Sequence, residues 1–318
     1  MRIGFAGLGN LGSKLAGSLL RNGVDLVVRD LDEAVVRSFT DRGASRASSP
    51  KELAERCDAV ITCLPSPTVC AEVMEADDGV LAGLGEGKLW LEMSTTDSAE
   101  VRRLAGLAEA RRATPVECPV SGGCHRAATG NISIFCGGSR EAFDLALPIL
   151  AMMGRKILHT GPLGSASILK VVTNYLASVN LASIGEAFAA AQQSGIDLAT
   201  TYEAIRISSG TSFVHETEGQ VILNGSYDIG FTLDLVQKDM SLFLGLAERA
   251  DLALEVAPVV AAMFDDAAAR YGPRALSPRV VQRSEEAAGS DFRAPGFPPE
   301  LIDEEPEQPG YEVVVNPG

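Results

Sequence analysis

The stretch "RIGFAGLGNLGSKLAGSLLRNG", residues 2–23, decides the fold of this 318-residue chain. Residues 2–8 form a short apolar run, as in a buried strand. The apolar residues of 11–23 have the spacing of a helix, which ends at Gly23. The glycines between them fit the pattern G-x-G-x-x-G. Because this pattern joins a strand to a helix, and the acid Asp30 ends the following strand, it is typical of a dinucleotide-binding site.

Each glycine of the pattern has a mechanical reason to be there. Gly7 permits a tight turn, Gly9 lets the backbone approach a pyrophosphate, and Gly12 allows the strand and the helix to pack closely. The helix N-terminus then faces the negative charge of the cofactor. The segment predicted to contact the cofactor is Gly7, Leu8, Gly9, Asn10, Leu11 and Gly12.

Asp30 bears on the choice between the two dinucleotides. A carboxylate here accepts hydrogen bonds from a ribose 2′-hydroxyl and repels a 2′-phosphate, so NAD is predicted in preference to NADP. The neighbouring Arg29 leaves NADP open, because an arginine at this place can accommodate the phosphate.

The first half of the chain continues to alternate strands with helices. Further strands are expected at 25–30, 58–64, 87–93, 114–118, 131–138 and 155–161. One helix is expected to begin at Ser49 and Pro50, an N-cap followed by proline, and another covers 139–152. The alternation predicts the α/β class, with a Rossmann-type doubly wound parallel sheet.

The composition changes near residue 163. The predicted organisation is a dinucleotide-binding domain at 1–162, an all-helical substrate and dimerisation domain at 163–289, and a Pro- and Glu-rich tail at 290–318 with no core of its own. The first helix of the second domain, about 163–194, is apolar on nearly every face. A helix of that kind needs a second partner surface, so a homodimer or homotetramer is predicted.

Charge and cysteine usage exclude several classes. A net charge of −15 argues against nucleic acid and anionic membranes as partners. The six cysteines form no C-x-x-C pair and the three histidines are scattered, which predicts free thiols, a reducing compartment and no metal site. The chain opens directly on a strand, so a cytoplasmic location is expected. The acids at 303–307 and the helix start around His215 are expected to be solvent-exposed.

A lysine interrupts the apolar helix "SASILKVVTNYLAS", residues 165–178. Lys170 belongs to a narrow polar stripe formed by Ser167, Lys170, Asn174 and Ser178. A buried ammonium is costly unless it is paired or used, so Lys170 is a candidate to bind a substrate oxygen and to exchange a proton with it. The alternative is a lysine that reaches solvent or pairs with an acid such as Glu186.

A second glycine-rich loop, "PVSGGCHRAATGN" at 119–131, follows the fifth strand at the carboxyl edge of the predicted sheet. Ser121, Gly122 and Gly123 offer a hydroxyl and backbone N–H groups to an anion; the alternative is a plain connecting loop. Arg126 on the same loop can clamp a carboxylate or a sulfonate, unless it pairs with a nearby glutamate.

These motifs resemble the β-hydroxyacid dehydrogenases, the family that includes 3-hydroxyisobutyrate dehydrogenase and tartronate semialdehyde reductase. The resemblance rests on "GFAGLGNLG" (4–12), "MSTT" (93–96), "PVSGG…GN" (119–131), "GSASILKVVTN" (164–174) and, more weakly, "FTLDLVQKDMSL" (231–242). It implies a 6-phosphogluconate dehydrogenase-like architecture and an NAD-linked oxidoreductase that acts on a small, anionic β-hydroxy acid.

The resemblance also assigns roles by position. Lys170 matches the family's catalytic lysine, Asn174 matches an asparagine that holds the substrate, and Ser121 with its two glycines matches the carboxylate cradle. The resemblance implies further cofactor contacts at Leu64, Pro65, Thr95 and Lys238, the last of which reaches the cofactor or the substrate.

The chain departs from the family pattern mainly at the substrate end. Leu11 replaces a methionine, Thr173 stands where many members have an asparagine, and His125 with Arg126 replaces small residues. Two other functions therefore stay open: a reductase of a small semialdehyde such as tartronate semialdehyde or a sulfonated analogue, and a dinucleotide-sensing protein without turnover. An imine reductase of similar architecture usually lacks the lysine.

Overall fold

The structure is a computed structural model that describes residues 1–315. The chain forms two compact units: the first contains Met1–Lys170 together with the chain from Asp303 onward, and the second is Val171–Ile302. The division lies within the long helix expected at 163–194. The expected tail at 290–318 is shared between the two units, since its first part belongs to the second unit and its later part to the first.

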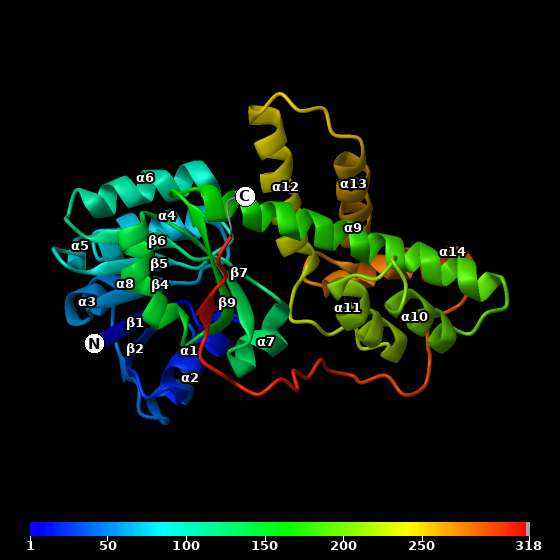
Figure 1. The fold of residues 1–318 in the computed structure, drawn as a ribbon, viewed down its shortest axis with the longest axis horizontal. Coiled ribbons are helices and arrows are strands. Elements are labelled where there is room, and N and C mark those ends of the chain that lie inside the picture. The colour runs from blue at the N-terminus through cyan, green and yellow to red at the C-terminus, as the bar shows by residue number, and fades with distance from the viewer. Residues whose placement is uncertain (316–318) are drawn as a thin grey trace. The chain divides into compact units, whose positions relative to one another are not determined.

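The first unit contains a single sheet (Figure 1). Its strands are β1 (Arg2–Ala6), β2 (Asp25–Arg29), β3 (Ser45–Arg46), β4 (Ala59–Thr62), β5 (Leu89–Glu92), β6 (Thr114–Glu117), β7 (Val120–Ser121), β8 (Ile132–Gly137), β9 (Gly154–Gly161) and β10 (Tyr311–Glu312). The order is β10-β9-β8-β6-β5-β4-β1-β2-β3, with β7 paired to β8. The doubly wound α/β fold is confirmed. Strand β8 runs antiparallel to β6 and β7, and β9 and β10 share the direction of β8, so one end of the sheet runs opposite to the parallel strands β1 to β6.

The strand order reverses at β1, which pairs with β2 on one side and with β4 on the other. Strands β2, β1, β4, β5 and β6 are mutually parallel, so the loops after β1, β4, β5 and β6 meet at one edge. In doubly wound sheets this edge, next to the reversal, binds the ligand. The strands carry side chains such as Ile3, Phe5 and Leu91 with no exposed surface, which explains their continuous apolar character.

Helices flank the sheet of the first unit (Figure 1). They are α1 (Gly12–Arg21), α2 (Glu33–Thr40), α3 (Pro50–Arg56), α4 (Pro67–Glu75), α5 (Val80–Gly83), α6 (Ser98–Glu109), α7 (Gly123–Thr129) and α8 (Arg140–Leu150). The expected start of α3 is confirmed, because the Ser49 hydroxyl accepts the Glu52 backbone N–H and Pro50 opens the helix. The expectation of an irregular loop over 119–131 is wrong, because α7 forms there between Gly122 (φ 129°) and Gly130 (φ 77°).

The second unit is helical, as expected. After α9 (Ser165–Gln193), whose first turns belong to the first unit, come α10 (Leu198–Arg206), α11 (Phe213–Asn224), α12 (Leu233–Arg249), α13 (Val256–Tyr271), the 3₁₀ turn Ser277–Val281 and α14 (Gln282–Ala288). Its core contains the fully buried rings of Phe188, Phe264 and Phe292. Phe292 is part of the expected tail, so the start of that segment does contribute to a core.

Two further features of the second unit concern the burial of His215 and the apolar length of α9. His215 lies in the first turn of α11, whose N-cap is Ser212, but the residue is 1% exposed and its Nε2 lies 2.9 Å from the Tyr202 carbonyl oxygen. Burial lowers the pKa of His215, so the expected solvated position is wrong. Within residues 1–315, α9 is the one helix long and apolar enough to cross a membrane by length and composition, a test that core helices of soluble proteins also pass.

Candidate functional site

The glycine loop after β1 has the geometry that a dinucleotide requires. Gly7 has φ 96°, and a Cβ there would lie 2.2 Å from the Cys63 carbonyl oxygen. A Cβ at Gly12 would lie 2.0 Å from the Gly7 carbonyl oxygen, whereas one at Gly9 would meet no atom within 4 Å. Two glycines are therefore needed to fold the loop. The third leaves an open approach to the backbone at the N-terminus of α1.

Asp30 follows β2, beside this loop. Its carboxylate accepts the backbone N–H of Leu8 at 2.5 Å and that of Asp32 at 2.9 Å. The Arg29 guanidinium donates to the Asp30 carbonyl oxygen, and its Nε is buried with no hydrogen-bond partner among residues 1–315. Asp30 therefore fixes the loop in addition to presenting a negative charge beside it.

The loops after β4 and β5 are joined by hydrogen bonds. The Leu64 backbone N–H donates to the Ser94 hydroxyl at 2.7 Å, and the Ser94 backbone N–H donates to the Glu92 carboxylate at 2.7 Å. Burial raises the pKa of the Glu92 carboxyl, and its bonds to Ser94 oppose the rise. This network fixes the turn at Leu64 and Pro65 and the segment that leads to Thr95 at the carboxyl edge of the sheet.

The segment after β6 contains the expected anion-binding residues. Ser121 lies in β7 opposite Ser133 of β8, and Gly122 and Gly123 (φ 85°) form the turn into α7. His125, in α7, is half-buried; burial and then the charge of Arg126 lower its pKa. The segment is therefore fixed by a strand pair on one side and a helix on the other.

Arg126 has an acidic neighbour. Its guanidinium lies 3.7 Å from the carboxylate of Glu305, which comes from the C-terminal part of the first unit. The structure thus contains the pairing with a glutamate that the sequence leaves open. The arginine side chain is 31% exposed.

Glu117, the last residue of β6, connects the sheet to the start of α9. Its carboxylate accepts the backbone N–H groups of Ala166 at 2.9 Å and Ser167 at 3.1 Å, as well as the Ser167 hydroxyl at 2.5 Å. Glu117 has no exposed surface; burial raises its pKa, and the bond from the Ser167 hydroxyl opposes the rise. The first turn of α9 is consequently fixed at the edge to which the glycine loops also belong.

Lys170 lies in the second turn of this helix and is 8% exposed. Ser167 and Ser178 of the expected polar stripe are also buried, at 3% and 7% exposed. The prediction of a buried lysine inside an apolar helix is therefore confirmed. Sequence reasoning did not identify Glu117, although an acid in an otherwise apolar strand was a visible signal.

The second unit contains its own polar cluster. The Asn174 side-chain amide donates to the Asp239 carboxylate at 2.5 Å, and the Lys238 ammonium lies 3.0 Å from the same carboxylate. Asp239 is 3% exposed. The structure thus joins Asn174 to Lys238 through an acid that sequence reasoning missed, although it follows Lys238 directly in the weaker family motif.

Two family models together match nearly the whole folded chain. Residues 2–161 match the NAD-binding domain of 6-phosphogluconate dehydrogenase, and residues 164–282 match the NAD-binding domain of NADP-dependent 3-hydroxyisobutyrate dehydrogenase. The chain belongs to the β-hydroxyacid dehydrogenase family. As a member of it, the protein is an NAD(P)-dependent oxidoreductase that acts on hydroxy acids.

Individual members of the β-hydroxyacid dehydrogenases agree with this assignment. The 2-(hydroxymethyl)glutarate dehydrogenase of Eubacterium barkeri is 31% identical over 266 residues, 83% of this chain and 88% of the relative. The NAD-dependent L-serine dehydrogenase of Pseudomonas aeruginosa is 35% identical over 256 residues, 78% and 85% of the two chains. The solved 3-hydroxyisobutyrate dehydrogenase of Salmonella typhimurium superimposes with a TM-score of 0.82 at 27% identity, and covers 89% of this chain and 99% of its own.

Proposed function

We propose that the protein catalyses the reversible, NAD-linked oxidation of the primary hydroxyl of a small β-hydroxy acid, with Lys170 as the general acid–base. The observation that carries the proposal is the set of hydrogen bonds from the first turn of α9 to Glu117. These bonds fix the turn that precedes the buried Lys170 at the carboxyl end of β6. Removing an ammonium from water costs free energy, so a lysine is buried only where its side chain is paired with another group or takes part in the chemistry.

The residues at this edge fit a dinucleotide. Gly7 and Gly12 shape the loop, the open side of Gly9 admits a pyrophosphate, and Asp30 accepts hydrogen bonds from a ribose hydroxyl. The further candidate contacts are Leu8, Asn10, Leu11, Leu64, Pro65, Thr95 and Lys238. When bound, the nicotinamide accepts or returns a hydride. NAD is favoured because the carboxylate of Asp30 repels a 2′-phosphate.

The chain's own residues then have separate tasks. The Ser121 hydroxyl and the N–H groups of Gly122 and Gly123 hold the substrate carboxylate, and Asn174 orients the substrate. The Lys170 side chain holds a proton at the alcohol oxygen: it accepts the proton as the alcohol is oxidised and donates it in the reverse reaction.

The names of the relatives support the substrate class. They act on 2-(hydroxymethyl)glutarate, L-serine and 3-hydroxyisobutyrate, and in each molecule a hydroxymethyl group is bonded to the carbon next to a carboxylate. Arg126, which replaces a small residue of the family pattern, favours a substrate with a second polar or anionic end.

A panel assay tests this function. NAD reduction is measured with 3-hydroxyisobutyrate, 2-(hydroxymethyl)glutarate, L-serine, glycerate and a hydroxyalkyl sulfonate, with isobutyrate as the control that lacks the hydroxyl. Turnover of at least one hydroxy acid, with none for isobutyrate, is the expected result. The runner-up, a semialdehyde reductase, would show rapid NADH oxidation by tartronate semialdehyde and negligible reverse turnover. A dinucleotide sensor would bind NAD and turn over nothing.

Replacing Asp30 with serine is expected to raise the preference for NADP relative to NAD. The variant loses the charge that repels a 2′-phosphate and keeps Arg29 beside the site. It also loses a carboxylate bond to Leu8, so the specificity constant for NAD should fall more than that for NADP rises. The ratio of the two specificity constants is the measurement. An unchanged ratio would show that Asp30 does not face the ribose.

We further propose that the protein is a homodimer or homotetramer. Helix α9 leaves Leu169 at 38% and Leu176 at 53% exposed, so part of its apolar surface has no cover in the described monomer. Light scattering at micromolar concentration is expected to give at least twice the monomer mass of 33.3 kDa. A single species at the monomer mass would overturn this proposal. We also propose a reducing, cytoplasmic location, because the six cysteines of the sequence include no C-x-x-C pair.

A further inference from the structure

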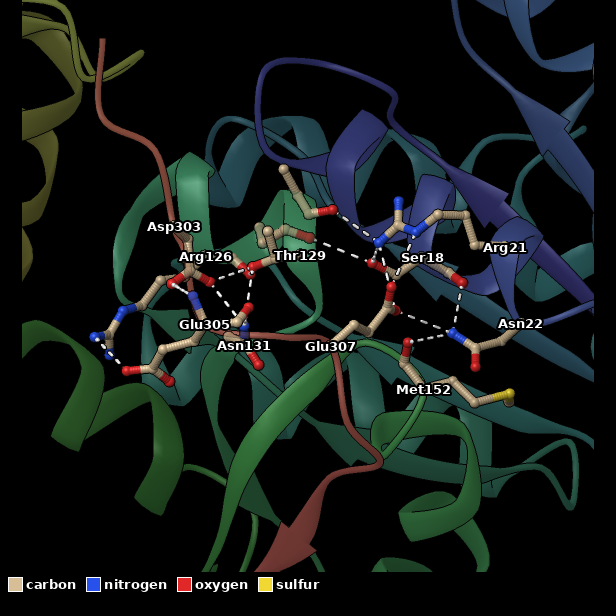
Figure 2. A network of polar contacts seen from close by, with 12 residues as sticks. Ser18, Arg21, Asn22, Arg126, Thr129, Asn131, Met152, Asp303, Glu305 and Glu307 are labelled. Atoms are coloured by element: carbon tan, nitrogen blue, oxygen red, sulfur yellow. Dashed lines mark hydrogen bonds and ion pairs between the residues drawn. The ribbon is translucent and has the colours of Figure 1, made fainter. Parts of the chain in front are cut away.

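The C-terminal part of the chain, from Asp303 onward, belongs to the first unit. Glu304, Glu305 and Glu307 are exposed, as expected, whereas Asp303 is half-buried. The acidic strap, defined as Asp303, Glu305 and Glu307, contacts side chains of α1, of α7 and of the residues that follow α7 (Figure 2). Helix α7 is the helix that follows Ser121, Gly122 and Gly123. The strap therefore lies beside the proposed anion-binding segment.

Asp303 makes the central contacts of the strap. Its carboxylate accepts the Thr129 hydroxyl and, at 2.8 Å, the side-chain amide of Asn131, while its other oxygen accepts the Glu305 backbone N–H. Burial raises the pKa of Asp303, but the bonds from Thr129 and Asn131 outweigh it and lower the pKa below its usual value. The contacts hold the residues where α7 ends.

Asn131 depends strongly on the strap. The residue is 4% exposed, and its amide donates to the Asp303 carboxylate and to the Glu305 carbonyl oxygen, both at 2.8 Å. Without these acceptors the buried amide would keep only a longer bond to the Thr129 hydroxyl, at 3.3 Å. An unpaired buried donor costs roughly 1–3 kcal/mol. Asn131 directly follows Gly130, the glycine that ends α7, so these bonds connect the strap to the end of the helix.

The two glutamates add weaker contacts. Glu305 is 63% exposed and lies 3.7 Å from Arg126, a geometry worth at most about 1 kcal/mol at a surface. Glu307 accepts from Arg21 at 3.2 Å and from Asn22 at 3.3 Å, and a carboxylate oxygen of Glu307 lies 2.9 Å from the position that a Cβ of Gly130 would take. These magnitudes single out Asp303 as the main anchor, with Glu305 acting on the orientation of Arg126.

The backbone fixes the rest of this segment. The Gly310 N–H donates to the Ala151 carbonyl oxygen at 2.9 Å, and β10 adds to the sheet beside β9. Arg140 also donates to Glu312 at 2.6 Å. The strap is therefore held from both sides, by side chains at 303–307 and by a strand at its end.

This segment lies outside the part of the chain that defines the family. The second family model ends at residue 282, and the Salmonella structure is 99% covered while it accounts for 89% of this chain. A seven-residue helix such as α7 has little stability of its own, so its position depends on tertiary contacts. Here the contacts at its end come from residues beyond those that the two family models match.

We infer that the acidic strap is a positioning element for the substrate. Asp303 fixes the end of α7 and Glu305 orients Arg126, so the C-terminal segment sets how tightly the anionic end of the substrate is bound. The inference rests on the proposed function of the Ser121 segment. It assigns the strap to substrate affinity, and neither to the proton transfer nor to the cofactor.

Replacing Asp303 with alanine tests this, and Glu304 supplies a matched control. Glu304 is an exposed acid next to it, with no hydrogen bond or ion pair found within residues 1–315. Asp303→Ala is expected to raise the KM for the hydroxy acid at least about fivefold, with kcat and the KM for NAD within twofold of wild type. Glu304→Ala should leave all three values unchanged. Asp303→Asn keeps one acceptor oxygen and should restore part of the affinity.

Amide hydrogen exchange gives a readout that needs no turnover. Residues 123–131 are expected to exchange faster in Asp303→Ala than in Glu304→Ala, while α8 stays unchanged. Equal substrate KM values in the two variants would overturn the inference, even if exchange differs, because the strap would then only stabilise the fold. If the wild-type protein turns over no hydroxy acid, the proposed function fails. In that case hydrogen exchange still tests the strap without any turnover: equal exchange of residues 123–131 in the two variants would show that Asp303 does not stabilise α7.

Discussion

Replacing Lys170 with alanine is expected to lower turnover by about 10²–10⁴-fold, the usual contribution of one general acid–base group. This corresponds to about 2.7–5.5 kcal/mol of transition-state stabilisation. The physical reason is that the alcohol oxygen must lose its proton as the hydride leaves, and the neutral amine of Lys170 is the group assigned to accept it. The residue is 8% exposed. Affinity for NAD should change little, because the lysine is assigned to the substrate oxygen.

Single-turnover rates with the best hydroxy acid from the panel provide the measurement. Lys170→Met is the matched variant, since it keeps the length and packing of the side chain and removes the proton-carrying group. Both variants should lose rate equally, with NAD titrations that match wild type. A variant that keeps more than about a tenth of the rate while its melting temperature changes would make Lys170 a structural residue, the alternative left open by its sequence.

Replacing Glu117 with alanine is expected to destabilise the protein by about 3 kcal/mol. The substitution leaves two backbone N–H groups and one hydroxyl of the first turn of α9 without their acceptor in a fully buried place, and each unpaired group costs roughly 1–3 kcal/mol where water cannot replace it. Such costs do not add fully, so the estimate lies below their sum. Urea unfolding monitored by circular dichroism measures the change.

Glu117→Gln separates the hydrogen bonds from the charge. Glutamine retains one acceptor oxygen but places its amide donor against a backbone N–H group of Ala166 or Ser167, so an intermediate loss of stability is expected. As a control, Glu109 lies at the exposed end of α6, and Glu109→Ala should change stability by less than about 0.5 kcal/mol. Equal midpoints for Glu117→Ala and Glu109→Ala would contradict the assigned role of the buried carboxylate.

The sequence alone predicts the features that depend on local backbone geometry. The glycine loop is an example, because the requirements at Gly7 and Gly12 follow from the turn itself and are met as expected. The alternation of strands and helices and the start of α3 at Ser49 are local for the same reason. Lys170 could be singled out because its charged side chain lies among apolar residues in a helix that the pattern predicts to be buried.

The features that were missed depend on partners far away in the chain. Glu117 was included in a strand without a role, because nothing in residues 114–118 reveals that the N-terminus of a later helix meets its end. Asp239 was also missed, because only the neighbouring Lys238 was assigned a role and nothing near it in the sequence indicates the bond from Asn174. The acids at 303–307 have the composition of a solvated tail, and only the fold brings Asn131 against them. Long-range polar pairing leaves no periodic pattern in one sequence.

The return of the C-terminal segment to the first unit has a consequence for synthesis. The helical unit is, in effect, an insertion between two parts of the first unit. A ribosome that adds 5–20 residues per second needs roughly 10 s to translate that insertion after the sheet strands up to β9 have emerged. During this interval the nascent first unit lacks β10 and the acceptors of Asn131, and β9 presents an unpaired edge. Completion of the amino-terminal unit of this enzyme therefore waits for residues 303–312.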